Sequence, residues 1–107
     1  MATSLSIVPQ DDSQDSGADD GIVERLLQQG LKAYRYGSYA EAVAQFSDAL
    51  RHAPGEARLY AHRGEAWRMQ CDFERAVADF SVALRMDPSD PTVLARRAAA
   101  HQGHGEY

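Results

Sequence analysis

The sequence repeats itself at an interval of 34 residues, and this period constrains the fold more than any other feature. Residues 57–90 align with residues 23–56 without an insertion or deletion. The matched landmarks are Gly30 and Gly64, Ala42 and Ala76, Phe46 and Phe80, Ala49 and Ala83, Leu50 and Leu84, and Pro54 and Pro88. A segment of this length is too short to bury a core of its own, so each copy must stack on its neighbour, as the repeats of a solenoid do.

Each copy has the pattern of two helices joined by a short turn. In the second copy, one set of residues recurs at helical spacing before the turn near Cys71 and Asp72, and another set recurs after it. These sets are Leu59, Tyr60, Arg63, Gly64 and Trp67, then Phe73, Ala76, Val77, Phe80, Ala83 and Leu84. Gly64 and Ala76 would allow a close approach between the helices, and Trp67 and Phe80 would fill the space opposite small residues. The pattern predicts an antiparallel helical hairpin.

Start and stop signals divide the chain into about five helices. The first is expected from about Gly21 to Tyr36, with Asp19 and Asp20 at its N-terminus and Gly37 after its end. Ser38 and Glu41 form the S-x-x-E signature of a capping box, which predicts a second helix. Further helices are expected from about Ala57 to the turn, from Phe73 after the capping candidate Asp72, and from Asp90 and Pro91 onward; Pro54 and Gly55 end the second helix.

With these landmarks in place, the chain resembles the tetratricopeptide repeat family, whose unit is a helix-turn-helix of this period. The second copy carries the family pattern at Tyr60, Gly64, Trp67, Phe73, Ala76, Phe80, Ala83 and Pro88. The first copy carries it at Leu26, Gly30, Tyr39, Ala42, Phe46, Ala49 and Pro54. It departs from the pattern at Ala33, where an aromatic residue is usual and Tyr34 follows. The resemblance implies an all-α fold, a right-handed superhelical stack of antiparallel helix pairs.

The expected organisation is an acidic leader over residues 1–20 and a repeat domain over residues 21–107. The domain comprises repeat 1 at about 23–56, repeat 2 at about 57–90 and half of a third repeat at about 91–107. The leader lacks periodicity and is expected to be disordered, or to dock as a short linear motif through Leu5 to Val8. A half repeat is consistent with a naturally short chain and with a fragment of a longer array.

Charge and composition exclude several functional classes. The leader holds five Asp and no Lys or Arg, so it accounts for the whole net charge of −5. The remaining eleven acidic residues balance the eleven basic ones. A repeat region without net charge is not expected to bind nucleic acid or an anionic membrane. The sequence has no stretch of membrane-spanning length and one cysteine, and we expect a cytoplasmic protein.

No motif predicts catalysis, a cofactor or a metal site. His101 and His104 are spaced as metal ligands can be, but no other Cys or His lies near them in sequence. Cys71 stands where the first copy has Gly37, and a passive turn cysteine is expected rather than a reactive thiol. Ser, His and Asp form no nucleophile motif, and no glycine cluster suits a phosphate. The chain is therefore expected to be no enzyme.

The resemblance implies a concave groove, lined chiefly by the first helix of each repeat, that receives a peptide or a partner's helix. The candidate groove residues are Leu27, Leu31, Tyr34, Arg58, His62, Glu65, Arg68, Met69 and Arg96. In one interpretation, the apolar members form a patch, and Arg58, Arg68 and Arg96 anchor an acidic ligand. In the other, Leu27 and Leu31 belong partly to the core and the arginines are solvated.

Two hypotheses about function follow, one from the groove and one from the incomplete third repeat. The first is a non-catalytic protein interaction module or scaffold that binds a peptide or partner segment in the groove. The alternative is a structural unit that self-associates into a homo-oligomer through the incomplete third repeat. Many family members grip the acidic C-terminal tail of heat-shock chaperones with two lysines, two asparagines and an arginine. Here those places hold Leu27, Leu31, His62, Thr92 and Arg96, so a chaperone tail is not the expected partner.

Overall fold

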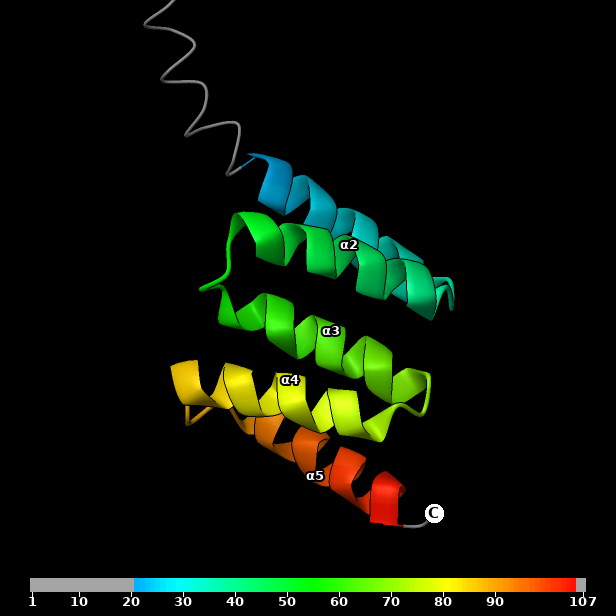
Figure 1. Ribbon diagram of the computed structural model, residues 1–107, viewed down its shortest axis with the longest axis vertical. Helices are drawn as coiled ribbons and strands as arrows, with labels where there is room; N and C mark the ends of the chain where they lie inside the picture. The colour runs from blue at the N-terminus through cyan, green and yellow to red at the C-terminus, as the bar shows by residue number, and fades with distance from the viewer. Residues whose placement is uncertain (1–20, 106–107) are drawn as a thin grey trace, which may run out of the picture.

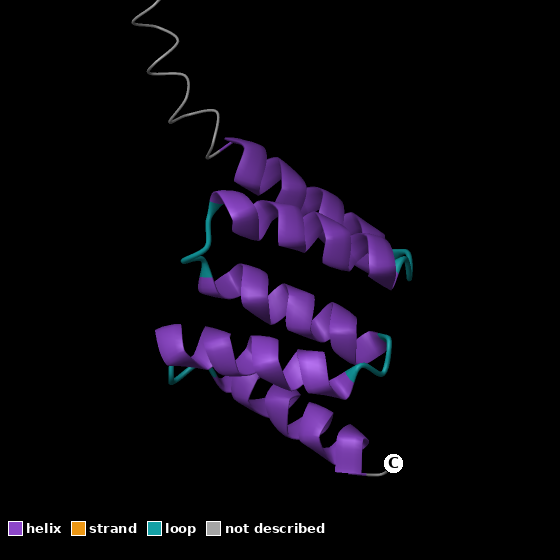
Figure 2. Ribbon diagram, in the orientation of Figure 1, coloured by secondary structure: helices purple, strands orange, loops and turns teal. Residues whose placement is uncertain are grey.

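The computed structural model describes residues 21–105, and these residues form helices joined by short connections (Figure 1, Figure 2). The N-terminal helix covers residues 21–35 of the described part. It is followed by α2 (Tyr39–His52), α3 (Ala57–Met69), α4 (Phe73–Met86) and α5 (Pro91–Gly105). The expected leader, with Asp19 and Asp20, lies outside the described residues.

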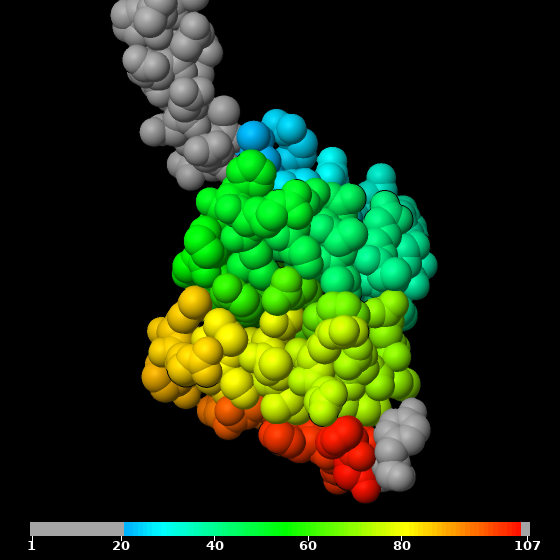
Figure 3. All heavy atoms as spheres, viewed as in Figure 1, coloured from blue at the N-terminus to red at the C-terminus, as the bar shows by residue number. Residues whose placement is uncertain are grey.

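The helices are stacked in the order of the sequence. In Figure 1 the N-terminal helix lies beside α2 at one end, and α5 lies at the other. Helix α3 contacts both α2 and α4, and α4 contacts α5. In the space-filling view of Figure 3, the colours accordingly follow one another in bands along the stack. This arrangement confirms the all-α solenoid expected from the period.

The repeated glycines accept the repeated phenylalanines, as the sequence pattern predicted. A Cβ atom added to Gly30 would lie 2.4 Å from a ring carbon of Phe46, and one added to Gly64 would lie 2.8 Å from a ring carbon of Phe80. Both rings are fully buried. Each hairpin is therefore held by a phenylalanine of its second helix packed directly on the backbone of its first helix.

Two clusters of buried side chains form the core. One lies between the N-terminal helix, α2 and α3. The other lies between α4 and α5 and includes Val93 and Ala100. Tyr60 packs against both clusters, and its hydroxyl donates a hydrogen bond to the carbonyl oxygen of Pro54 at 3.2 Å. The core is thus continued from one repeat to the next.

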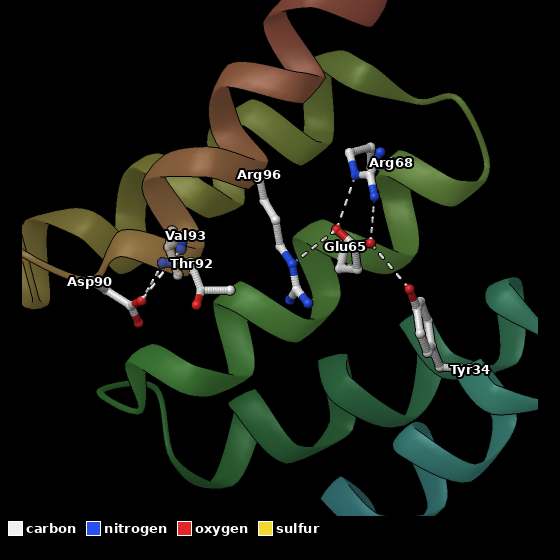
Figure 4. Close-up of polar contacts among 7 residues, drawn as sticks. All are labelled: Tyr34, Glu65, Arg68, Asp90, Thr92, Val93 and Arg96. Atoms are coloured by element: carbon white, nitrogen blue, oxygen red, sulfur yellow. Dashed lines mark hydrogen bonds and ion pairs between the residues drawn. The ribbon is translucent and has the colours of Figure 1, made fainter.

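Most turns and helix caps lie where the start and stop signals in the sequence predicted them. Gly37 and Cys71, which are 34 residues apart, both have positive φ, +81° and +63°. Asp72 caps α4, because its Oδ1 accepts a hydrogen bond from the backbone N–H of Arg75 at 3.3 Å. Asp90 likewise accepts hydrogen bonds from the backbone N–H groups of Thr92 and Val93 (Figure 4).

The prediction of a capping box at Ser38 and Glu41 is wrong in one part, the hydrogen bond expected from the serine side chain. Ser38 is the N-cap residue of α2, but its side chain makes no capping hydrogen bond. Its backbone, with φ −87° and ψ 70°, nearly matches that of Asp72, with φ −91° and ψ 76°. Nothing else in the structure explains why only the aspartate makes the bond, since serine and aspartate are equally common caps.

Candidate functional site

A pocket of about 180 Å³ opens on one side of the stack, where all three repeats contribute a side chain. Leu31 and Tyr34 come from the N-terminal helix, and Arg96 comes from α5. The full lining is Leu31, Tyr34, Phe46, His62, Glu65 and Arg96. Five of these residues are candidates from the sequence, and the helical spacing of each first helix places them on the same side. The structure thus brings residues up to 65 positions apart in the sequence, Leu31 and Arg96, to one pocket.

The walls of the pocket are largely apolar. The imidazole of His62 stacks on the ring of Phe46, with ring centroids 5.6 Å apart and planes inclined by 23°. Burial lowers the pKa of His62, and the nearby charges of Arg96 and Arg58 lower it further. The imidazole is therefore neutral near pH 7 and contributes a flat aromatic surface.

Glu65 forms the polar edge of the pocket. Its carboxylate accepts hydrogen bonds from Arg68 Nε at 3.0 Å, from Arg68 Nη2 at 2.6 Å and from the Tyr34 hydroxyl at 3.1 Å (Figure 4). Arg96 Nε lies 3.7 Å from its Oε1. These contacts come from three different repeats, so Glu65 ties the helices together at the place where the pocket opens.

The ionisation of this cluster follows from its contacts. Burial alone would raise the pKa of Glu65, but the hydrogen bonds and charge of Arg68, the charge of Arg96 and the hydrogen bond from Tyr34 outweigh it. The pKa of Glu65 therefore lies below its ordinary value, and the carboxylate is ionised at neutral pH. Burial and the neighbouring Glu65 charge raise the pKa of Tyr34, so its hydroxyl remains a donor.

Arg96 retains hydrogen-bonding capacity. Its distance of 3.7 Å from Glu65 is that of an ion pair without a hydrogen bond, and 38% of its side chain is exposed. In Figure 4 its guanidinium lies between Glu65 and Thr92, which α5 presents one turn earlier. Arg96 is thus the cation of the pocket whose donors can reach an incoming group.

The structure corrects part of the expected groove. Leu27 is only 3% exposed and belongs to the core, so it offers no surface to a ligand. Its burial follows from its position on the N-terminal helix, where it packs in the same cluster as Phe46. Leu31 packs against that cluster while also lining the pocket. Met69 is exposed but does not line the pocket.

Two of the three arginines expected to anchor an acidic ligand are already paired within the chain. Arg68 binds Glu65 through two nitrogens. Arg58 binds Glu24 at 3.2 Å and Glu56 at 3.1 Å. The spacing of Glu65 and Arg68, three residues apart on one helix, is a signal from which the first pair could have been found.

Phe46 is the residue of the pocket that sequence reasoning missed. It lies on α2, a second helix of a repeat, whereas the family resemblance directs attention to first helices. Its fully buried ring packs on the Cβ-free backbone of Gly30 and lies behind His62 at the pocket. The pairing of Gly30 and Phe46 is visible in the repeat pattern, where it indicates core packing alone.

Comparison with known proteins agrees with this architecture. A family model described as tetratricopeptide repeat matches residues 27–91, which is more than half of the chain. The chain belongs to the tetratricopeptide repeat family. Membership makes it a helical repeat protein of a class that serves protein interaction. No curated protein sequence matches the chain.

Solved structures of tetratricopeptide repeat domains superpose on the chain. The TPR domain of Arabidopsis OM64 is 24% identical, with a TM-score of 0.78 over 83% of this chain and 74% of that one. The TPR2B domain of yeast Sti1, in a complex with an Hsp70 peptide, is 27% identical, with a TM-score of 0.76 over 80% and 69%. The second TPR of Spaghetti (RPAP3), bound to the HSP90 peptide SRMEEVD, is 23% identical, with a TM-score of 0.77 over 84% and 85%.

Within residues 21–105, none of the helices has both the length and the apolar character needed to cross a bilayer.

Proposed function

We propose that this tetratricopeptide repeat chain binds an extended segment of a protein partner across the pocket formed by Leu31, Tyr34, Phe46, His62, Glu65 and Arg96. One apolar side chain of that segment fills the pocket, and a carboxylate beside it pairs with Arg96. The observation that carries the proposal is the meeting of three repeats around one apolar pocket with an available guanidinium at its edge.

The size and walls of the pocket suit an apolar side chain. A cavity of about 150 Å³ lined by apolar side chains is large enough to bind benzene, and this pocket has about 180 Å³. The imidazole of His62, supported by the fully buried ring of Phe46 behind it, provides a flat surface, and Leu31 provides an aliphatic one. Filling such a pocket removes apolar surface from water, at about 25 cal/mol for each Å² buried.

The charge of the edge favours an acidic ligand. The single carboxylate of Glu65 is shared by Arg68 and Arg96, so the three groups together carry one positive charge. Because Arg68 is held by two hydrogen bonds and Arg96 by none, a ligand carboxylate would pair with Arg96. A charge-assisted hydrogen bond of this kind contributes about 1.5 to 3 kcal/mol.

We further propose that a chaperone tail is not the natural ligand, although Sti1 and Spaghetti domains of this fold were solved with chaperone peptides. Of the five places that would form the two-carboxylate grip, one holds the buried Leu27, and another holds His62, stacked on Phe46. Leu27 has no polar group, and the neutral imidazole of His62 has a single N–H and no charge, so neither replaces a lysine or asparagine at a terminal carboxylate. The peptide SRMEEVD is therefore expected to bind no more tightly than its scrambled sequence.

Selection from a peptide library tests the proposal without a named partner. Random 12-residue peptides would be selected on the 107-residue chain, and the affinities of the selected peptides measured by fluorescence anisotropy. The expected peptides combine an apolar residue with Asp or Glu. Arg96→Gln should weaken them about tenfold or more, whereas Arg85→Gln, an exposed arginine on α4, should leave their affinity unchanged.

A thermodynamic cycle makes the test specific. Replacing the acidic residue of a selected peptide by its amide should weaken binding to the wild-type chain and have little further effect on Arg96→Gln. Equal losses for both chains, or selected peptides with no acidic residue, would contradict the proposed pairing.

A further inference from the structure

One face of α5 is left open by the residues that the structure describes. It consists of Leu94, Arg97, Ala98 and His101, and we refer to it as the open face. Leu94 is 42% exposed, Ala98 and His101 are exposed, and Arg97 is half-buried. Helix α5 lies at the end of the stack, and the described helix packed along it is α4 (Figure 1).

The 34-residue repeat shows what such a face does elsewhere in the chain. The residues of α3 at the same places are Tyr60, Arg63, Gly64 and Trp67. All of them face α4. Gly64 accepts the ring of Phe80, Tyr60 and Trp67 pack against the α4 cluster, and Arg75 of α4 lies 5.0 Å from the centre of the Trp67 ring. The corresponding face of α5 thus has the geometry that receives a helix.

Arg63 and Arg97 occupy the same place in successive repeats and also make the same hydrogen bond to a serine. Arg63 Nη1 donates a hydrogen bond to Ser47 Oγ at 3.1 Å, and Arg97 Nη1 donates one to Ser81 Oγ at 3.4 Å. In both cases the serine lies 16 residues earlier, on the preceding second helix. The two guanidinium groups are therefore set in equivalent positions on successive repeats.

The two arginines differ in whether they pair with a carboxylate. Arg63 Nε and Nη2 bind the two carboxylate oxygens of Asp79 on α4, at 2.8 and 2.9 Å. This carboxylate is buried, so the pair is desolvated and geometrically specific. Arg97 has no ion pair with any residue between 21 and 105. Its guanidinium is placed where the repeat would supply a carboxylate from a following helix.

We propose that the open face of α5 docks an amphipathic helix of a partner protein that carries an Asp or Glu paired with Arg97. The partner helix lies along α5 as α4 lies along α3. Opposite Ala98 it presents a side chain smaller than phenylalanine. A Cβ at the equivalent Gly64 would lie within 3 Å of the Phe80 ring, and α5 already has a Cβ at this place.

The α5 helix of a second copy of this chain cannot supply the carboxylate that would pair with Arg97. Helix α5, Pro91–Gly105, contains no Asp or Glu. Two open faces packed together would bring Arg97 of each copy into a shared interface without a carboxylate. Desolvating unpaired like charges is costly, which favours a partner of different sequence.

The chain's own α4 supplies a probe with the required chemistry. We would use a labelled 14-residue peptide with the α4 sequence Phe73–Met86, made helical by a side-chain lactam and carrying Phe80→Leu. It retains Asp79, the residue that binds Arg63. The peptide is expected to bind the 107-residue chain, measured by fluorescence anisotropy. No binding at millimolar concentration would overturn the proposal.

Charge exchange then locates the site. Arg97→Asp should weaken the probe at least tenfold, and a probe with Asp79→Arg should bind Arg97→Asp better than the wild-type chain. Arg85→Asp, an exposed charge change on α4, should have no effect. Affinities that do not depend on the charge at residue 97 would overturn the proposal. Arg96→Gln should leave probe binding unchanged, which separates this surface from the proposed peptide pocket.

Changing the size of the facing side chains tests whether residue 80 of the probe lies opposite Ala98. A probe that keeps Phe80 should bind the wild-type chain more weakly than the probe with Phe80→Leu, and this preference should be reversed by Ala98→Gly. An unchanged preference would contradict the register. Sedimentation of the chain without the probe should show a monomer. A dimer that Arg97→Asp dissociates would identify a second copy as the occupant and overturn the proposed partner.

Discussion

Replacing Gly64 by alanine sets two known effects against each other. In a helix interior alanine is favoured over glycine by about 1 kcal/mol, so an unobstructed site would be stabilised. Here the new Cβ would lie 2.8 and 2.9 Å from carbons of the fully buried Phe80 ring and 3.2 Å from Asp79 Cβ. Overpacking of this kind costs about 1 to 3 kcal/mol. We expect Gly64→Ala to lower the free energy of unfolding by about 1 kcal/mol, which corresponds to roughly 4 to 8 °C in Tm.

Urea unfolding followed by circular dichroism would measure this difference. In a Phe80→Leu background the ring is absent, so the same substitution should be neutral or stabilising, and the two changes should be coupled. Gly55→Ala is a matched control in the turn before α3, where a Cβ meets nothing within 4 Å, and it should change stability little. Stabilisation by about 1 kcal/mol in both backgrounds would refute the packing of the ring on the glycine backbone.

Three further predictions concern single side chains. Asp72→Ala should cost about 1 kcal/mol in thermal or urea unfolding, because it removes the cap of α4, whereas Ser38→Ala at the uncapped start of α2 should have little effect; equal losses would contradict the assignment of the caps. Cys71→Gly should stabilise the chain by about 1 kcal/mol, since φ is +63° there and glycine tolerates it, and destabilisation would mean that the cysteine side chain is needed. Because the pKa of Glu65 is lowered in the folded chain, the stability that its charge contributes is present above an ordinary carboxyl pKa of about 4.3 and is lost as the pH falls through the folded-state pKa. The difference in stability between the wild-type chain and Glu65→Gln should therefore shrink on acidification, and a difference that stays constant with pH would count against the ion-pair cluster.

The repeat pattern predicted the fold because it is redundant. Gly64 and Phe80 recur 34 residues after Gly30 and Phe46, so the same packing is specified twice, and the helices end at the expected turns. Local signals alone were less dependable. The S-x-x-E motif at Ser38 looked as strong as the aspartate at 72, yet only Asp72 makes a capping hydrogen bond.

The site was harder to predict than the fold, because its properties depend on contacts between repeats. Helical phase placed Tyr34, His62 and Arg96 on one side of the stack. It did not show that Leu27 is covered, since burial depends on how the first two helices pack. It also did not show that Glu65 contacts Tyr34, Arg68 and Arg96 together. The contacts of Glu65 with Tyr34 and Arg96 each join residues 31 positions apart, which no local spacing encodes.

A partner segment bound in the pocket between Leu31, His62 and Arg96 would change the surroundings of those residues. This can be measured by following the backbone amide chemical shifts of the isotopically labelled chain as a selected acidic peptide is added. We expect the largest changes around Leu31 and Tyr34, from His62 to Arg68 and at Arg96, and we expect Arg96→Gln to reduce them. Changes confined to the opposite side of the stack, around Arg63 and Arg75, would mean that the peptide binds elsewhere and would rule out the pocket.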